Sequence, residues 1–328
     1  MPDCQNPVNF QIAAFYQFSQ VPTKNVGMLA EQIEKLGQSM DLRGLVILAD
    51  EGINGTVSGR TQNEVSRFFL ELESLLGLTA ITPKWSEAPA WPFRKFKVRV
   101  RREIVTLGFA EGELPVQPLP PKSDRHLAPQ EWNRCLQEEE VVVLDTRNWY
   151  ETRIGKFKSA VDPKLDEFRE FEDYLDSCDI LKDRKVLIYC TGGIRCEKAI
   201  VEMENKGFQN VFQLDGGILG YLAEFPNDQF DGECFVFDQR VAVDQKLQPT
   251  VIYKMCPHCG QPADQPLTCL RCDSNTVVCP TCAGHEDLRF RTCSKNCAHH
   301  YGRAPGKKGR SQDQGFRFEA RRAKTSDS

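Results

Sequence analysis

The residues best suited to chemistry form one short loop. Its members are Cys190, Thr191, Gly192, Gly193, Ile194, Arg195 and Cys196. The loop follows a stretch at 185–189 that predicts a buried strand, and a helix is expected to begin near Arg195 or Cys196. Two consecutive glycines let backbone N–H groups point inward, and the helix N-terminus adds positive charge. A thiol among such donors loses its proton readily, so the pattern predicts that Cys190 is a nucleophile whose thiolate or persulfide is cradled by 191–195.

Cys196 lies six residues after Cys190 and leaves two interpretations open. If the two sulfurs lie close together, Cys196 could act as a resolving cysteine that attacks a Cys190 persulfide. It could equally be a helix residue that faces the core. For Cys190 itself, the alternative to a reactive thiol is a buried cysteine beside a packing glycine pair.

Two further motifs on either side of the loop favour a reactive site. Asp145, Arg147, Glu151 and Gly155 fit the pattern Asp-x-Arg-x3-Glu-x3-Gly, and residues 214–218 read Leu-Asp-Gly-Gly-Ile. With the Cys190 loop between them, these motifs resemble those of rhodanese domains, which implies a parallel α/β fold with Asp145 and Arg147 supporting the loop. The related tyrosine phosphatases have five residues between cysteine and arginine. This loop has four, which favours a sulfane sulfur over a phosphate.

The first hundred residues predict a different fold. Strands are expected at 10–18, 44–49, 55–58, 78–83 and 95–100, with helices at 25–36 and 61–75. Thr61 and Glu64 have the spacing of a capping box for the second helix. The order begins βαββαβ, which is that of the ferredoxin-like fold that acylphosphatases share, and one further strand follows.

A basic strand in this segment predicts a nucleic-acid partner. Residues 91–102 hold six basic residues and no acid. The expected RNA contacts are Arg94, Lys95, Lys97, Arg99 and Arg101. With strand periodicity, alternate basic side chains share one face, as binding to a phosphate backbone requires. Trp91 or Phe93 could stack on a base. The alternative is an ordinary solvated sheet face.

Eight of the 14 cysteines gather near the C-terminus. They are Cys256, Cys259, Cys269, Cys272, Cys279, Cys282, Cys293 and Cys297. Their Cys-x2-Cys and Cys-x3-Cys spacing predicts two structural Cys4 zinc sites, either sequential or interleaved. Unliganded thiols and an iron–sulfur cluster are the alternatives.

Composition sets the remaining limits. The chain has 328 residues, a net charge of −4 and 27% charged residues, as expected of a soluble protein with several domains. No apolar run approaches the roughly 18 residues that span a bilayer, and the N-terminus has no signal-peptide pattern, so we expect a cytoplasmic protein that does not contact membranes. The expected segments are a ferredoxin-like domain (8–105), a linker (106–126), a rhodanese domain (127–227), a Cys-rich module (228–300) and a flexible basic tail (301–328).

The loop extended to Ala199 reads CTGGIRCEKA, and residues 51–55 read Glu-Gly-Ile-Asn-Gly. Together with the domain order, these strings resemble the tRNA uridine(34) hydroxylase family, a group of rhodanese-domain proteins. The resemblance implies oxidation of the wobble uridine in tRNA anticodons to 5-hydroxyuridine, with molecular oxygen as co-substrate and Cys190 as the catalytic cysteine. It implies no flavin or haem, and the sequence contains no NAD-binding fingerprint. Within Glu-Gly-Ile-Asn-Gly, Glu51 and Asn54 are expected either to contact substrate or to cap a turn. The alternatives are a thiosulfate or persulfide sulfurtransferase and a non-enzymatic adaptor that binds zinc and RNA. The oligomeric state is not predicted.

Overall fold

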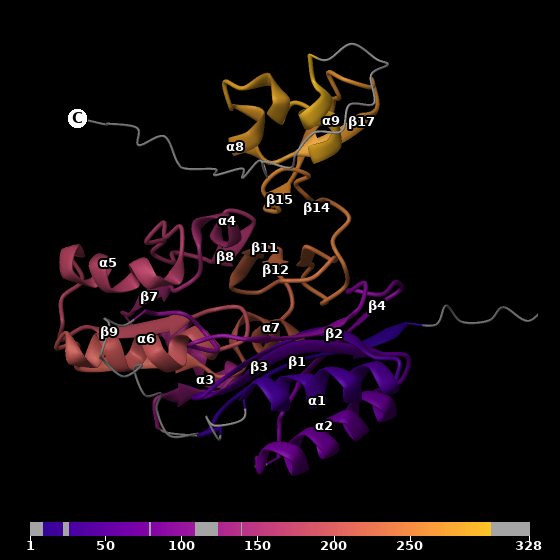
Figure 1. Ribbon diagram of the computed structural model, residues 1–328. Helices are drawn as coiled ribbons and strands as arrows, with labels where there is room; N and C mark the ends of the chain where they lie inside the picture. The colour runs from indigo at the N-terminus through magenta and orange to yellow at the C-terminus, as the bar shows by residue number, and fades with distance from the viewer. Residues whose placement is uncertain (1–8, 22–25, 79, 109–123, 139, 303–328) are drawn as a thin grey trace, which may run out of the picture. The chain divides into compact units, whose positions relative to one another are not determined.

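The computed structural model in Figure 1 describes residues 9–21, 26–78, 80–108, 124–138 and 140–302. Most of the expected linker and almost all of the expected basic tail lie outside these ranges. The chain divides after residue 249 into two compact units, which are considered separately. In the described ranges, no helix has both the length and the apolar character needed to cross a membrane.

The first unit begins with an antiparallel sheet backed by two helices. Its elements are β1 (Phe10–Phe18), α1 (Val26–Ser39), β2 (Arg43–Ala49), β3 (Gly52–Gly59), α2 (Gln62–Leu76), β4 (Lys84–Ala88) and β5 (Phe96–Val100). The strand order is β4-β1-β3-β2-β5, with β5 parallel to β2 at the edge. Both helices cover one face of the sheet (Figure 1), where Phe15, Val46 and Phe68 belong to the buried core. The predicted ferredoxin-like fold is confirmed. The two helices leave the other face of the sheet uncovered, so that face can pack against another domain.

Local signals explain most of these boundaries. The capping box of α2 is confirmed, because Thr61 and Glu64 each bond the other's backbone N–H. The strand predicted at 78–83 is wrong. Ile81 is buried against α2, and its N–H donates to the Glu73 carboxylate instead of a neighbouring strand. Its apolar character therefore reflects packing, and pairing with β1 begins only at Lys84.

The second half of the first unit is a parallel α/β domain. Its elements are β6 (His126–Leu127), α3 (Pro129–Glu138), β7 (Val142–Asp145), α4 (Trp149–Thr152), β8 (Gly155–Phe157), η2 (Phe168–Glu170), α5 (Phe171–Ser177), β9 (Lys185–Tyr189), α6 (Ile194–Asn205), β10 (Asn210–Leu214) and α7 (Gly217–Glu224). The sheet order β6-β10-β9-β7 is parallel throughout. Separate apolar clusters cover its two faces, one around Trp132 and Tyr221 and the other around Phe171 and Met203.

Residues 228–249 belong to this first unit, although their sequence was grouped with the Cys-rich module. Strand β11 (Phe230–Gly232) pairs with β8, and β12 (Cys234–Phe235) pairs with β13 (Ala242–Val243). Phe230 and Cys234 are buried in the same apolar cluster as Trp132. This segment therefore completes the rhodanese-like core.

The second unit is built from short hairpins and single helical turns. Its elements are β14 (Lys254–Met255), β15 (Pro262–Ala263), β16 (Gln265–Thr268), β17 (Asn275–Val278), α8 (Pro280–Ala283), η3 (Leu288–Phe290) and α9 (Lys295–His300). Its small apolar cluster consists largely of cysteines, joined by Ala263, Val278 and Phe290. So small a core needs an additional cross-link to be stable.

Candidate active site and metal centres

Cys190 directly follows β9, and α6 begins at Ile194 after the loop, close to where the sequence predicted a helix. Only 1% of the residue is exposed, and the Gly193 N–H donates a 3.1 Å hydrogen bond to its sulfur. Burial raises the pKa of the thiol. A hydrogen bond from Cys196, the charge of Arg195 and the N–H groups of Arg195 and Gly192 outweigh burial and lower the pKa to about 6. The loop therefore favours a thiolate at neutral pH.

Arg195 is held in place by a carboxylate from the first rhodanese-type motif. Its two terminal nitrogens lie 2.7 and 2.8 Å from the two oxygens of Glu151, which is fully buried. Such bidentate pairing fixes the plane of the guanidinium. Thr191 also donates to Glu151, at 3.4 Å. Glu151 thus ties both sides of the Cys190 loop to α4.

Asp145 and Arg147 form a buried ion pair with no exposed surface. Arg147 Nη2 lies 2.7 Å from Asp145 and donates a second 2.7 Å hydrogen bond to the Gly155 carbonyl. Only glycine fits at position 155, since a Cβ there would lie 2.5 Å from the Glu233 carbonyl oxygen. The Asp145–Arg147 pair therefore holds α4 and β8 in place. Glu151 of the same motif then connects α4 to the Cys190 loop.

The Gly216-Gly217 pair supports the loop from behind. The N–H groups of Ile218 and Leu219 donate to the carbonyls of Cys190 and Thr191, at 3.0 and 3.1 Å. A Cβ on Gly217 would lie 2.6 Å from the Cys190 carbonyl, and Gly217 has a positive φ of 62°. Only glycine allows α7 to approach so closely.

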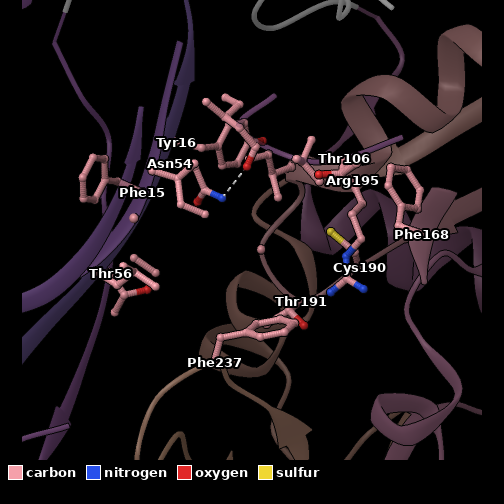
Figure 2. A pocket seen from close by; sticks show the side chains of 18 of the residues that line it. Phe15, Tyr16, Asn54, Thr56, Thr106, Phe168, Cys190, Thr191, Arg195 and Phe237 are labelled. Atoms are coloured by element: carbon pink, nitrogen blue, oxygen red, sulfur yellow. Dashed lines mark hydrogen bonds between the residues drawn. The ribbon is translucent and has the colours of Figure 1, made fainter. Parts of the chain in front are cut away.

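A cavity of about 480 Å³ opens beside Cys190, between the parallel domain and the uncovered face of the N-terminal sheet. Its walls include Tyr16, Asn54 and Thr56 from the sheet, and Cys190 and Arg195 from the loop (Figure 2). Phe93, Phe168 and Phe237 also line it. A cavity of this size, with aromatic walls and a few polar groups, suits a small planar ligand.

Direct contacts join the N-terminal sheet to the loop. The Tyr16 hydroxyl donates a 2.9 Å hydrogen bond to Glu197 of α6, which also accepts from Gln213 at 2.9 Å. Burial raises the pKa of Tyr16 well above its usual value, with the charge of Glu197 adding to the effect. Gly193 has a φ of 103°, and a Cβ there would lie 2.8 Å from the Tyr16 hydroxyl. The second loop glycine is therefore fixed by both its conformation and its neighbour.

Glu51 and Lys198 make a second link between the domains. Lys198 has no exposed surface, and its ammonium lies 2.8 Å from Glu51 and 2.5 Å from Glu103. It also donates to the Val105 carbonyl. Asn54 bonds the Ile104 carbonyl at 3.0 Å and lines the cavity. The Glu-Gly-Ile-Asn-Gly motif therefore holds the segment at 103–106 as a wall of the cavity.

Cys196 is fully buried at the start of α6, and its interaction with the Cys190 thiol shifts the pKa values of the two groups in opposite directions. Thr146 Oγ1 lies 3.7 Å from the Cys196 sulfur. Burial, the hydrogen bond to Cys190 and its charge raise the pKa of Cys196 well above the usual value. Cys196 is thus both a core residue and a neighbour of Cys190.

Only part of the predicted basic strand lies beside the cavity. Phe96 points into the helix-covered core, so Lys97, Arg99 and Arg101 lie on the cavity face, and Arg101 lines the cavity. Lys97 forms a 2.6 Å salt bridge with Glu34 of α1. Arg94, Lys95 and Arg99 are exposed. Trp91 packs between Phe10 and the guanidinium of Arg43, whereas Phe93 lines the cavity.

In the second unit the eight cysteines form two groups of four that could hold a metal ion. The groups are Cys256, Cys259, Cys279 and Cys282, and Cys269, Cys272, Cys293 and Cys297. The pairs alternate along the chain, so the interleaved arrangement is the observed one. Sulfurs of Cys259 and Cys279 lie 3.5 Å apart, and those of Cys272 and Cys297 lie 3.8 Å apart. A tetrahedral zinc ion about 2.3 Å from each sulfur would place them about 3.8 Å apart. The donor set and the spacing therefore fit zinc.

Two residues of the site carried no signal in the sequence. Tyr16 and Lys84 line the cavity from β1 and β4. Neither belongs to a motif with a fixed spacing, and only the docking of the two domains brings them beside the Cys190 loop and Glu197 of α6.

The fold and the cavity define a rhodanese-like protein with an acylphosphatase-like domain before it. Three family models agree: a UPF0176 acylphosphatase like domain at 10–104, a rhodanese-like domain at 128–224 and a rhodanase C-terminal domain at 231–298.

Curated relatives identify the family. A tRNA uridine(34) hydroxylase of Bdellovibrio bacteriovorus is 44% identical over 98% of this chain and 89% of its own length. Proteins of the same name from Deinococcus radiodurans (43% identical over 78% of this chain and 83% of its own) and from Wolbachia pipientis of Culex pipiens (42% over 74% and 84%) are also similar. The chain belongs to the tRNA uridine(34) hydroxylase family.

Proposed function

We propose that this protein hydroxylates uridine 34, the wobble base of tRNA anticodons, to 5-hydroxyuridine with molecular oxygen as co-substrate. The observation that carries the proposal is the placement of a readily ionised thiol in a base-sized cavity shared by two domains. The name of the relatives supplies the substrate and the reaction class. Because such an enzyme acts on tRNA, we expect it in the cytoplasm.

Cys190 is the catalytic residue of this proposal. Its thiolate is the nucleophile of the cavity, and residues 191–195 stabilise its charge through backbone N–H groups and Arg195. Asp145 and Arg147 act indirectly, by bracing the helix that carries Glu151. No flavin, NAD or haem is part of the proposal.

The anticodon loop is single-stranded, so its wobble base can turn out of the stack and enter a pocket. Phe93 and Phe237 are aromatic walls against which a base can pack. Arg99, which is exposed, and Arg101, which lines the cavity, would contact the adjoining phosphates, and the exposed Arg94 and Lys95 would add to this binding. Lys97 contributes less, because Glu34 already neutralises its charge.

We also propose that the protein binds two structural zinc ions. Each would be held by one interleaved Cys4 group and would cross-link a unit whose own core is small. Zinc here supplies stability, and the reaction does not depend on it chemically.

Nucleoside mass spectrometry of tRNA tests the function. Cells lacking the gene should lose 5-hydroxyuridine derivatives at position 34, wild-type protein should restore them, and Cys190→Ala should not. A suitable control is Cys178→Ala, which changes a partly buried cysteine that does not line the cavity. Unchanged 5-hydroxyuridine after deletion would show that the proposed function is wrong.

Sulfur transfer is the second candidate, because the N–H groups around Cys190 would also hold a persulfide. It predicts that purified protein converts thiosulfate and cyanide to thiocyanate with Cys190 as the acceptor. Hydroxylation predicts that this rate stays negligible while tRNA is modified.

A further inference from the structure

Lys84 brings a positive charge from the N-terminal sheet to the Cys190 loop. It is the first residue of β4, is partly buried and lines the same cavity as Cys190. Its ammonium lies 4.6 Å from the centre of the Tyr16 ring. A Cβ on Gly216 would lie 3.8 Å from Lys84 Cε, so the side chain extends over the glycine pair that supports Cys190.

Among the described residues, no carboxylate pairs with the Lys84 ammonium, whereas the neighbouring cationic side chains are paired. Arg195 is paired with both oxygens of Glu151, and Lys198 is held by two carboxylates. In the described ranges the Lys84 ammonium forms no salt bridge or hydrogen bond, and it contacts the Tyr16 ring. Burial lowers its pKa, while the negative charges of Asp215, Cys190 and Glu197 oppose that effect. The ammonium can therefore still donate to a ligand oxygen in the cavity.

Other cations at the cavity are less suited to this role. Arg101 and Arg169 are both exposed, and Arg169 is paired with Glu167 at 2.7 Å. Water screens exposed charges strongly, whereas a charge on a partly buried amine acts at closer to full strength. Lys84 is thus the best-placed donor beside the Cys190 thiolate.

The reactivity of uracil suits a cavity that holds a thiolate and a positive charge. Its C5–C6 double bond is conjugated with the C4 carbonyl, so a nucleophile adds at C6 and the displaced electron pair moves to O4. C5, the carbon that the proposed reaction hydroxylates, is electron-rich in the resulting enolate. Donors aimed at an oxygen that gains charge are an effective means of stabilising such a step.

We propose that Lys84 is a catalytic residue that donates to uracil O4 while the Cys190 sulfur adds to C6. The Cys190 lone pair forms the S–C6 bond, the C5–C6 π pair moves to O4, and the Lys84 ammonium stabilises or protonates that oxygen. The step is redox-neutral, and its reversal restores the thiolate and uracil. This inference rests on the proposed function, because it assumes that uridine is the base in the cavity.

The step can be tested with full-length protein and tRNA that carries 5-fluorouridine at position 34. Under aerobic turnover, hydroxylation at C5 should trap the Cys190–C6 adduct so that it survives a denaturing gel. C5 then carries fluorine in place of the proton whose loss would otherwise restore the C5–C6 double bond and release Cys190. We expect adduct with wild type and none with Cys190→Ser. Lys84→Met and Lys84→Gln should each slow adduct formation at least about 10-fold with tRNA affinity unchanged within about two-fold, while Lys84→Arg should recover part of the rate. Lys35→Met, an exposed change on α1, is the matched control.

The outcomes separate the two proposals. Adduct formation at the wild-type rate by Lys84→Met or Lys84→Gln would overturn the role of Lys84. Absence of adduct with a wild-type enzyme that does hydroxylate uridine 34 would overturn the addition step and leave the proposed function intact. Absence of hydroxylation by wild type on unmodified tRNA would instead reject the function on which the inference rests.

Discussion

The Cys190 loop and the Cys-rich unit use the same side chain in opposite ways. In the loop a single thiolate is stabilised by backbone N–H groups and by Arg195, all supplied by the surrounding fold. In the second unit eight thiols gather in two groups with little else around them. A thiolate that protein groups stabilise stays free to react. Thiolates that share a metal lose that freedom and stabilise a fold instead.

Metal removal should produce the largest difference between the two regions. Cysteine-bound zinc contributes about 10–16 kcal/mol to small domains. Cys256→Ser should therefore lower the zinc content from two ions to one per chain and unfold much of residues 250–302, as hydrogen exchange would reveal. Cys190 should still react with iodoacetamide at its wild-type rate. Retention of two zinc ions by Cys256→Ser would contradict the interleaved ligand sets.

Loss of the loop thiol should have the reverse effect. Cys190→Ser should lower hydroxylation of tRNA by at least about 1,000-fold, or about 4 kcal/mol, because a serine hydroxyl is not ionised at neutral pH. Zinc content and the unfolding temperature should change little, since serine fills nearly the same space. A variant that keeps more than a tenth of the activity would remove Cys190 from the mechanism.

The next effect is on the pKa of Cys190. Alkylation of the wild-type thiol should have its midpoint near pH 6. Arg195→Gln should raise that midpoint by one unit or more, about 1.4 kcal/mol per unit, because it removes the charge that favours the thiolate and leaves Glu151 without its partner. An unchanged midpoint would show that the backbone N–H groups suffice.

The same shift predicts how stability depends on pH. The folded pKa of Cys190 lies below that of an unfolded cysteine, about 8.5, so the unfolded chain binds more protons between the two values. The contribution of this thiolate is complete above about pH 8.5 and is lost as the pH falls through about 6. In Cys190→Ser that part of the slope should disappear, which urea titrations at several pH values would measure.

The smallest effect concerns the basic strand. Arg99→Gln should reduce the salt dependence of tRNA binding by about one ion, whereas Lys97→Gln should reduce it by less, since Glu34 already pairs with Lys97. Filter binding at several salt concentrations would measure both slopes. Equal reductions would mean that tRNA displaces Glu34.

Structural features that depend only on residues close together in the sequence could be predicted well. The capping box of α2, the strand–loop–helix around Cys190 and the alternation along β5 all follow from local periodicity and turn chemistry. The strand expected at 78–83 failed because an apolar residue can be buried without strand pairing, and Ile81 is an example. Periodicity reports burial, but it does not identify the partner.

The sequence by itself determined that Cys190 sits in an anion-stabilising loop, that eight cysteines could bind metal and that the chain resembles one enzyme family. Tertiary structure alone decided what surrounds the thiol. Tyr16 contacts Glu197 across 181 positions, and Lys198 contacts Glu103 across 95. The interleaving of the Cys pairs was likewise decided only by the fold of the second unit. Lys84 reaches the loop across the same interface as Tyr16 and Glu103. Local backbone preferences act over a few residues, whereas these contacts exist only after separately folded surfaces have buried each other.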